Sequence, residues 1–369
     1  MVVLSSLFVF PAMYSLARAL RAEVPVAIGA GMLLAFFPNV WFYGGTALSD
    51  VPSMVLVVTA CALLLRGRVV LGAIVLAIAA GVRPQNLLIG FVPFLLSLNA
   101  ALRWGGGLKP ALRFASAALI LAIIVIATYG TAAAESGGWS AYRDVLAHHE
   151  AYIRNTDSFL APRHPGLIQV ADDFFFRPYR AMPVNLVVTL LAAIAVVRRR
   201  QWLILAIFGP FCLFAWLFLD FHSSSRFSVA YMPMFAMLAA AGIPRRGYAA
   251  VLAAVTALMI VWSWPALRVV HTTVSPPVAA IDAARKAAGT LYVDERLAPH
   301  AELLLPDRER TLVRVAPPFV DDPNAILLRE GASTAPGAKN FARARERLEG
   351  IARKRYFEAS VVFGRRPTV

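Results

Sequence analysis

Ten apolar stretches, separated by short polar connections, fill the first 265 residues of the chain. They approach the roughly 17 to 25 residues that a helix needs to cross a bilayer, although residues 69–82 and 86–102 are short and their ends are poorly marked. Lipid offers the backbone no hydrogen-bond partner, so such segments cross it as helices. The sequence therefore predicts a mainly α, polytopic helical membrane protein of about ten spans, at residues 2–16, 24–43, 51–65, 69–82, 86–102, 114–133, 183–197, 202–219, 227–243 and 248–265.

The composition supports this class. Hydrophobic residues make up 59% of the chain and charged residues 15%, with a mean hydropathy of +0.66. In an ordinary soluble domain, charged residues are about 25% of the total. An ordinary soluble fold is therefore excluded.

The cations of the connecting loops indicate an orientation. Five alternate connections hold twelve of them: Arg18, Arg21, Arg66, Arg68, Arg103, Lys109, Arg113, Arg198, Arg199, Arg200, Arg245 and Arg246. The other side holds seven over a much longer length of loop: Arg83, Arg143, Arg154, Arg163, Arg177, Arg180 and Arg226. Since Lys and Arg gather in cytoplasmic loops, we expect the first side to be cytoplasmic. The chain start and the segment after Pro265 then lie outside.

The net charge of +15 has a matching explanation. The inner loops account for much of this charge. Their cations reflect the orientation of the protein in the membrane and can also attract anionic lipid. Basic residues of the tail, such as Arg343 and Lys354, fit a solvated helix face or contacts to phosphate groups. No nucleic-acid partner is needed to explain the charge.

Two regions depart from the apolar pattern. The first is a long outer loop at about 134–182, where aromatic residues alternate with charges as in helices that lie on a membrane surface. The second is the tail, 266–369, which reads as helices at 278–288, 299–305 and 341–353 and strands at 290–294, 311–315, 325–329 and 356–363. We expect domain 1–265 to span the membrane and the tail to form a small extracytoplasmic α/β domain.

Polar chemistry gathers on the predicted outer side. All six histidines lie there, as do eight of the nine acids in the membrane region. A cluster of titratable groups on one face indicates that binding or reaction takes place there, although loops are polar in any case. The two cysteines, Cys61 and Cys212, fall within apolar stretches, and no Cys/His spacing suits a metal. We therefore predict neither a metal site nor a cofactor.

Asp50 is the first candidate catalytic residue. It follows Leu48 and Ser49 at the outer end of two apolar stretches, where an acid is expensive unless it is functional. The alternative is a helix cap, because Ser-Asp-x-Pro is good helix-start chemistry. Glu150, beside His148 and His149, is the second candidate, either as a base or as solvated surface.

A candidate phosphate site comes from two further outer connections. Arg83 and Gln85 lie in Gly-Val-Arg-Pro-Gln, and His222 and Arg226 lie in Asp-Phe-His-Ser-Ser-Ser-Arg-Phe. A guanidinium group can bind a phosphate through two parallel hydrogen bonds. The alternatives are an arginine that snorkels at a helix turn and a polar helix cap.

The same segments resemble a known family. Phe37-Pro38, Tyr43-Gly44, residues 47–52, 81–84 and 222–227, followed by Pro233, are similar in order and placement to motifs of the GT-C superfamily of membrane glycosyltransferases. The likeness is greatest to bacterial members akin to protein mannosyltransferases and lipid A aminoarabinose transferases, and it covers roughly residues 1–265.

The resemblance implies an inverting glycosyltransferase of the bacterial inner membrane. Its donor is a sugar linked to polyprenyl phosphate, and its acceptor is an extracytoplasmic lipid, glycan or protein. It implies that Arg83 and Arg226 bind the donor phosphate and that Asp50 positions the acceptor or holds the donor sugar.

The family's principal acid lies in the first outer loop, after the first span, and the sequence begins with what matches the second span. We therefore expect an upstream span and acidic loop. The alternative is a non-catalytic membrane protein, either a transporter or an inactive relative that acts in a complex.

Overall fold

The computed structural model describes residues 2–46, 48–105, 108–156, 166–178, 181–199, 201–219, 224–285, 291–294, 312–315, 326–330, 337–349 and 359–363. The chain divides into two compact units. The first is Met1–Trp262 with Glu349–Ile351, and the second is Ser263–Leu348 with Ala352–Val369.

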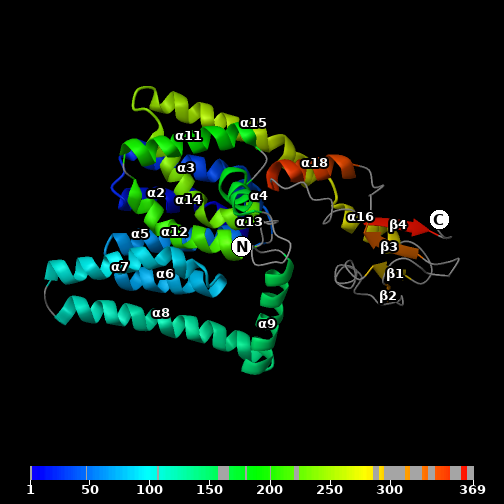
Figure 1. Cartoon of the computed structure of the whole chain (residues 1–369), viewed down its shortest axis with the longest axis horizontal. Helices are drawn as coiled ribbons and strands as arrows, with labels where there is room; N and C mark the ends of the chain where they lie inside the picture. Colours follow the sequence, from blue (N-terminus) through cyan, green and yellow to red (C-terminus); the bar gives the residue numbers. More distant parts are fainter. Residues whose placement is uncertain are drawn as a thin grey trace. The chain divides into compact units, whose positions relative to one another are not determined.

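The described part of the first unit is helical (Figure 1). Its elements are α1 (Val2–Ser6), α2 (Val9–Ala19), α3 (Val24–Phe36), α4 (Pro38–Gly44), α5 (Asp50–Leu65), α6 (Val69–Val82), α7 (Asn86–Gly105), α8 (Leu108–Glu135), α9 (Trp139–Thr156), α10 (Leu167–Ala171), the π-helix η1 (Asp172–Phe176), α11 (Met182–Arg199), α12 (Trp202–Phe218), α13 (Ser224–Phe227), the 3-10 helix η3 (Ser228–Tyr231) and α14 (Met232–Gly242). Helix α15 (Tyr248–Thr272) begins in this unit.

Each predicted apolar stretch is helical, but three of them are broken. Residues 2–16 form α1 and α2, and residues 227–243 are divided among α13, η3 and α14. Residues 24–43 form α3 and α4, which meet at an angle of 61°. The break lies at Phe37, because the residue before a proline is driven out of the helical conformation, and Phe37 has a ψ of 132°.

Two helices of the described residues, Ala111–Glu135 and Tyr248–Thr272, are long and apolar enough to cross a membrane, and the bent pair α3 and α4 makes a third if it is one span. Five shorter apolar helices accompany them. These helices are compatible with membrane insertion. The count of ten spans stays a prediction.

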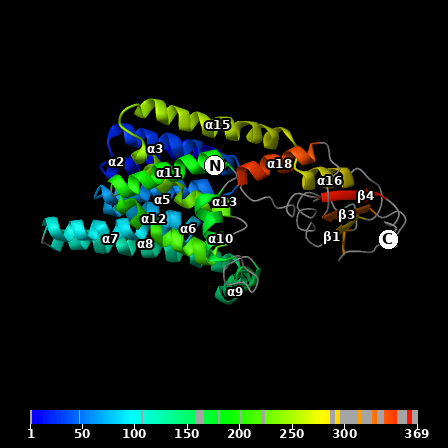
Figure 2. The same cartoon turned by 45° about the horizontal axis from the view of Figure 1, so that its top comes forward.

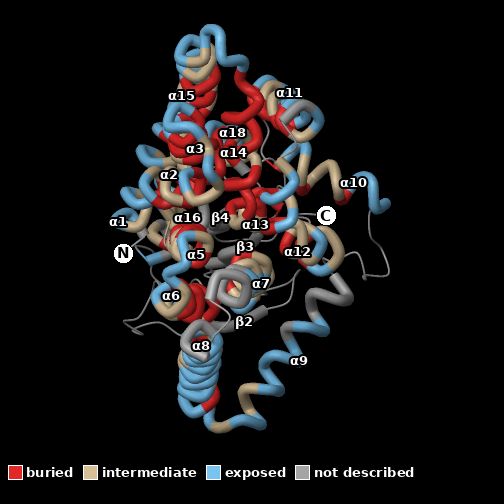
Figure 3. Tube along the Cα trace, turned by 90° about the vertical axis from the view of Figure 1, so that its left-hand side faces the viewer, coloured by how far each residue is buried: buried red, intermediate tan, exposed pale blue. Residues whose placement is uncertain are grey.

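The core of the first unit lies around α3, α5 and α14. Helix α14 packs against α11 and α3, while α5 packs against α2, α6 and α7. Figure 3 shows α14 largely buried and α8 largely exposed. Close packing requires small residues here, since a Cβ at Gly242 would collide with the carbonyl oxygen of Leu191 on α11. The apolar, exposed surface of α8 is what a lipid-facing helix presents.

The second unit contains a mixed four-stranded sheet with the order β2-β1-β3-β4, comprising β1 (Leu291–Asp294), β2 (Leu312–Val315), β3 (Ile326–Glu330) and β4 (Ala359–Phe363). Strand β1 pairs in parallel with β2 and β3, and β4 runs antiparallel to β3. Helix α16 (Pro276–Arg285) packs on β3 and β4, as Figure 2 shows, and α18 (Ala338–Glu349) precedes β4 in the chain. The helix expected at 299–305 lies outside the described residues. An independent domain outside the cytoplasm stays a prediction.

Candidate functional site

Asp50 is the first residue of α5, and its side chain is buried, with 2% exposed. Ser49 is the N-cap residue, and no side chain caps this helix end by a hydrogen bond. The helix start that Ser-Asp-x-Pro predicts is present, with Asp50 in the first turn rather than at the cap position. The positive end of the helix dipole still favours an acid in the first turn.

Arg83 approaches Asp50 from the end of α6. Pro84 follows it, and the residue before a proline prefers an extended backbone, so the helix ends here with Arg83 at φ −150° and ψ 113°. The Nη2 atom of Arg83 lies 2.7 Å from Oδ1 of Asp50, and 19% of the arginine side chain is exposed.

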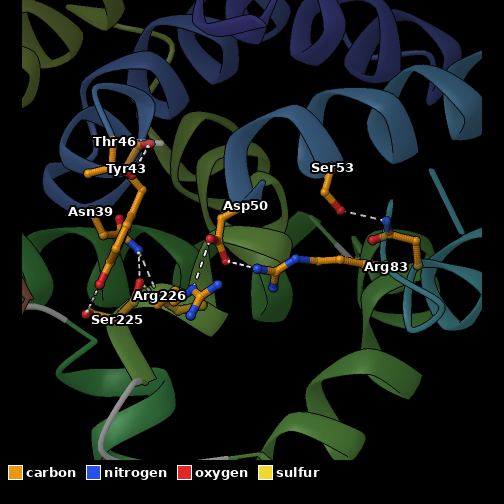
Figure 4. Close-up of polar contacts among 10 residues, drawn as sticks. Asn39, Tyr43, Thr46, Asp50, Ser53, Arg83, Ser225 and Arg226 are labelled. Carbon is orange, nitrogen blue, oxygen red and sulfur yellow. Dashed lines mark hydrogen bonds and ion pairs between the residues drawn. The ribbon is translucent and has the colours of Figure 1, made fainter. Parts of the chain in front are cut away.

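Arg226 reaches the same carboxylate from α13. Its Nε donates a hydrogen bond of 3.0 Å to Oδ2 of Asp50, and 34% of its side chain is exposed. Figure 4 shows the carboxylate between the two guanidinium groups. We call Asp50, Arg83 and Arg226 the Asp50 cluster.

Burial controls the energetics of this cluster. Removal from water lowers the pKa of Arg83, the charge of Asp50 raises that pKa, and the charge of Arg226 lowers it again. A guanidinium group nevertheless stays protonated in proteins. The cluster therefore holds one buried carboxylate between two partly exposed guanidinium groups, and the buried charge is stable only while it is paired.

A second polar network holds α13 and η3 against α4. The amide nitrogen of Asn39 donates to the carbonyl oxygen of Ser225 at 3.2 Å and to the hydroxyl of Ser228 at 2.8 Å. The hydroxyl groups of Tyr43 and Ser225 form a hydrogen bond of 3.2 Å. Because Ser225 precedes Arg226, these contacts fix the backbone that carries the arginine (Figure 4).

Asn86 fixes the backbone near Arg83 in a similar way. It is buried at the start of α7, and its amide nitrogen donates to the hydroxyl of Ser53 and to the carbonyl oxygen of Ala79, both at 2.7 Å. These bonds join α5, α6 and α7 where the turn that contains Arg83 connects two of them. The position of the guanidinium is thus set by neutral hydrogen bonds as well as by charge.

Two buried polar atoms beside these networks have no hydrogen-bond partner in the described part of the chain: Oδ1 of Asn39 and the hydroxyl of Ser224. Both residues are fully buried. Buried polar groups are normally satisfied by protein or by ordered water, so these two atoms are exceptions next to the Asp50 cluster.

The structure brings some of the predicted site residues together and leaves others apart. Asp50, Arg83 and Arg226 come together, although 176 residues separate Asp50 from Arg226. Gln85 is half-buried in the turn after Arg83. Glu150 is exposed on α9, as is His148, and neither belongs to the Asp50 cluster. His222 lies outside the described residues.

The sequence did not reveal the uncharged residues that support the Asp50 cluster by hydrogen bonds. Asn39, Ser53, Asn86 and Ser228 were not singled out, yet each makes a buried hydrogen bond near the cluster. The available signal was a polar residue within an apolar stretch, which in a membrane span indicates a partner or a function. Asn39 carries that signal most clearly, because residues 24–43 are otherwise almost free of hydrogen-bonding side chains.

Within the described ranges, no group of three or more His, Cys, Asp or Glu side chains is placed to hold a metal ion. Comparisons with protein-family models, curated proteins and solved structures found no match. The function is therefore inferred from the chemistry of the Asp50 cluster and its surroundings.

Proposed function

We propose that the protein is a polytopic membrane glycosyltransferase that moves a sugar from a polyprenyl-phosphate-linked donor to an extracytoplasmic lipid, glycan or protein. The observation that carries the proposal is the Asp50 cluster, in which two arginines from distant segments converge on one buried carboxylate. The resemblance of its segments to GT-C motifs agrees with this function but is not needed to recognise an anion site.

The cluster has the charge and the donors that a phosphate needs. Two guanidinium groups exceed one carboxylate by one positive charge. Arg226 uses Nε for Asp50, which leaves its two Nη groups out of that contact, and parts of both arginine side chains are exposed. Arginine donors in such an arrangement stabilise the negative charge that develops on a leaving phosphate.

The surroundings suit a sugar beside that phosphate. Asn39 and Ser224 each present a buried polar atom without a partner among the described residues, and both lie next to the segment that carries Arg226. Hydroxyl groups both donate and accept hydrogen bonds, so a polyhydroxyl ligand can satisfy an amide oxygen and a serine hydroxyl after a modest side-chain shift. A purely apolar ligand would leave both unsatisfied.

Asp50 acts in this proposal as a positioning residue. Both carboxylate oxygens contact guanidinium groups, and the side chain is almost fully buried. It therefore holds the two arginines on one carboxylate. The acceptor base is not assigned to any described residue, and a catalytic role of Glu150 stays a prediction.

The test uses the lipid product that every such donor releases. Binding of polyprenyl phosphate and of polyprenol, which lacks the phosphate, is compared by the thermal shift of the purified full chain in detergent. We expect polyprenyl phosphate to give the larger shift, and Arg226→Lys to remove most of the difference, because lysine keeps the charge but loses the fork geometry.

The matched control is Arg177→Lys. Arg177 also pairs with an acid, Asp172, but lies outside the Asp50 cluster. That variant is expected to distinguish the two lipids as the wild type does. Equal shifts for both lipids in the wild type would refute the phosphate site. Selective binding of polyprenyl phosphate without sugar transfer by membranes that contain the protein would instead support an inactive relative.

A further inference from the structure

A cavity lies among loops that connect other helix ends of the first unit. It has a volume of about 510 Å³ and is formed by the α2–α3 turn, Gln201 before α12, and the end of α14 with Arg245 beyond it. We call it the inner pocket, because all of these loops lie on the predicted cytoplasmic side. Its charged lining residues are Arg21, Glu23 and Arg245.

Arg21 has an unusual backbone. Its φ is +61°, and it is the one non-glycine residue with a positive φ in the described ranges. Its amide donates to the carbonyl oxygen of Arg18 at 3.1 Å, and that of Ala22 donates to Ala17 at 3.0 Å. This pair of bonds is the Schellman motif that ends many helices, in which the left-handed position is usually glycine.

Two other helices of the same unit end in the same motif with glycine. At the end of α5, Gly67 has φ +76°, and Arg68 donates to Leu63 at 2.9 Å. At the end of α8, Gly137 has φ +93°, and Gly138 donates to Ala133 at 2.8 Å. The chain therefore places glycine at two such positions and arginine at the third. An observed backbone outlier of this kind points to a use for the side chain.

The charged groups around Arg21 indicate what its side chain can do. Glu23 forms an ion pair with Arg245, which occupies Nη2 of Arg245 and orients its guanidinium group. Among the described residues, the Arg21 guanidinium makes no hydrogen bond or ion pair. The lining thus carries one positive charge more than negative, together with unused guanidinium donors. The other lining residues are Gln201, which adds a polar amide, and the apolar residues Leu20, Ala22, Val26, Met237 and Ala241.

We propose that the inner pocket binds the phosphate headgroup of an anionic lipid from the cytoplasmic leaflet. Arginine recognises phosphate through paired hydrogen bonds, and basic pockets between membrane helices on the cytoplasmic side suit anionic headgroups. The position of the pocket at helix ends on the predicted cytoplasmic side favours a lipid headgroup over free phosphate, since headgroups of that leaflet lie at this level. This site does not depend on the proposed glycosyltransferase activity and shares no residue with the Asp50 cluster.

The experiment measures the thermal shift of the purified full chain in detergent. The probes are short-chain phosphatidylglycerol, short-chain phosphatidylcholine and inorganic phosphate. We expect phosphatidylglycerol to raise the melting temperature more than either of the other two. Arg21→Gly should weaken the apparent affinity for phosphatidylglycerol about tenfold, because a charge-assisted contact is lost.

Arg21→Gly is suited to this test, because glycine accepts the left-handed backbone and the variant should fold. The matched control is Arg246→Gly, which removes an exposed arginine of the α14–α15 loop that does not line the pocket. It should leave the affinity unchanged. Equal weakening in both variants would mean that only the general charge of this face matters and would overturn the site. Equal thermal shifts with inorganic phosphate and phosphatidylglycerol would overturn the assignment of a lipid as the ligand.

Discussion

The Asp50 cluster and the inner pocket contain the same ingredients, two arginines and one acid, at opposite ends of α3 and α14. Glu23 precedes α3 and Arg245 follows α14, so both lie at one end of these helices. At the other end, α4 follows α3 and η3 precedes α14, next to the segment that carries Arg226. In the cluster, the acid is 2% exposed and contacts both arginines. In the pocket, the acid is 59% exposed and pairs with Arg245, which is 77% exposed.

The difference shows that burial, rather than the choice of residues, decides what a group of charges does. The Coulomb energy of an ion pair rises several-fold as the surrounding dielectric falls from that of water to that of a protein. Charges in the Asp50 cluster therefore fix one geometry, and neutral hydrogen bonds reinforce it. Charges in the inner pocket stay adjustable, which suits a surface that accepts a lipid headgroup.

The largest predicted effect concerns the two acids. Asp50→Asn keeps the shape but leaves two partly buried arginines without a counter-charge, so we expect the free energy of unfolding to fall by about 3 kcal/mol, the lower end for breaking a buried pair. Glu23→Gln should change it by less than about 1 kcal/mol, as for an exposed pair. Denaturation in detergent measures both. Similar losses in the two variants would show that burial does not separate the clusters.

A neutral buried residue provides the next test. Asn86→Ala removes the donor to the buried hydroxyl of Ser53 and one of the two donors to the carbonyl of Ala79, which keeps the amide of Arg83, so we expect a loss of about 2 kcal/mol. Gln85→Ala, in the same turn but half-buried, is the control and should have little effect. If Asn86→Ala were harmless, charge alone would hold Arg83 in place.

The helices were predictable because apolar stretches of this length have few other ways to satisfy their backbone. The breaks within the apolar stretches were harder to predict. Pro38 marks the bend between α3 and α4, and Pro11 and Pro233 lie in the first turns of α2 and α14. However, α7 and α12 continue through Pro93 and Pro210, so a proline in an apolar stretch does not by itself show where a helix breaks.

The candidate site was predictable residue by residue but not as an arrangement. Asp50, Arg83 and Arg226 each stand out as charges beside apolar stretches. Their pairing depends on how helices far apart in the sequence pack, so the sequence alone suggested arginines open to phosphate rather than arginines held by Asp50. The hydrogen bonds of Asn39 and Asn86 depend on the same packing.

Salt should affect the two groups of charges to different extents. Raising the ionic strength from about 0.1 M to 1 M shortens the Debye length from about 10 Å to 3 Å and screens exposed charges much more than buried ones. The effect of Glu23→Gln on stability should then nearly disappear, while most of the effect of Asp50→Asn remains. Measuring both variants at the two salt concentrations checks this, and a parallel decline would indicate that water reaches the Asp50 cluster freely.

The smallest predicted effect has the opposite sign. Arg21→Gly removes the strain of a left-handed L-residue, about 1 to 2 kcal/mol, but glycine also gives the unfolded chain more freedom, which costs about 0.5 to 1 kcal/mol. In the absence of added lipid, we therefore expect a net gain of about 0.5 to 1 kcal/mol. Gly67→Ala, at the equivalent position after α5, should lose about 1 kcal/mol, because its φ is +76° although nothing obstructs a Cβ there. Denaturation without lipid measures both, and a loss of stability in Arg21→Gly would mean that the arginine supports the fold rather than a ligand.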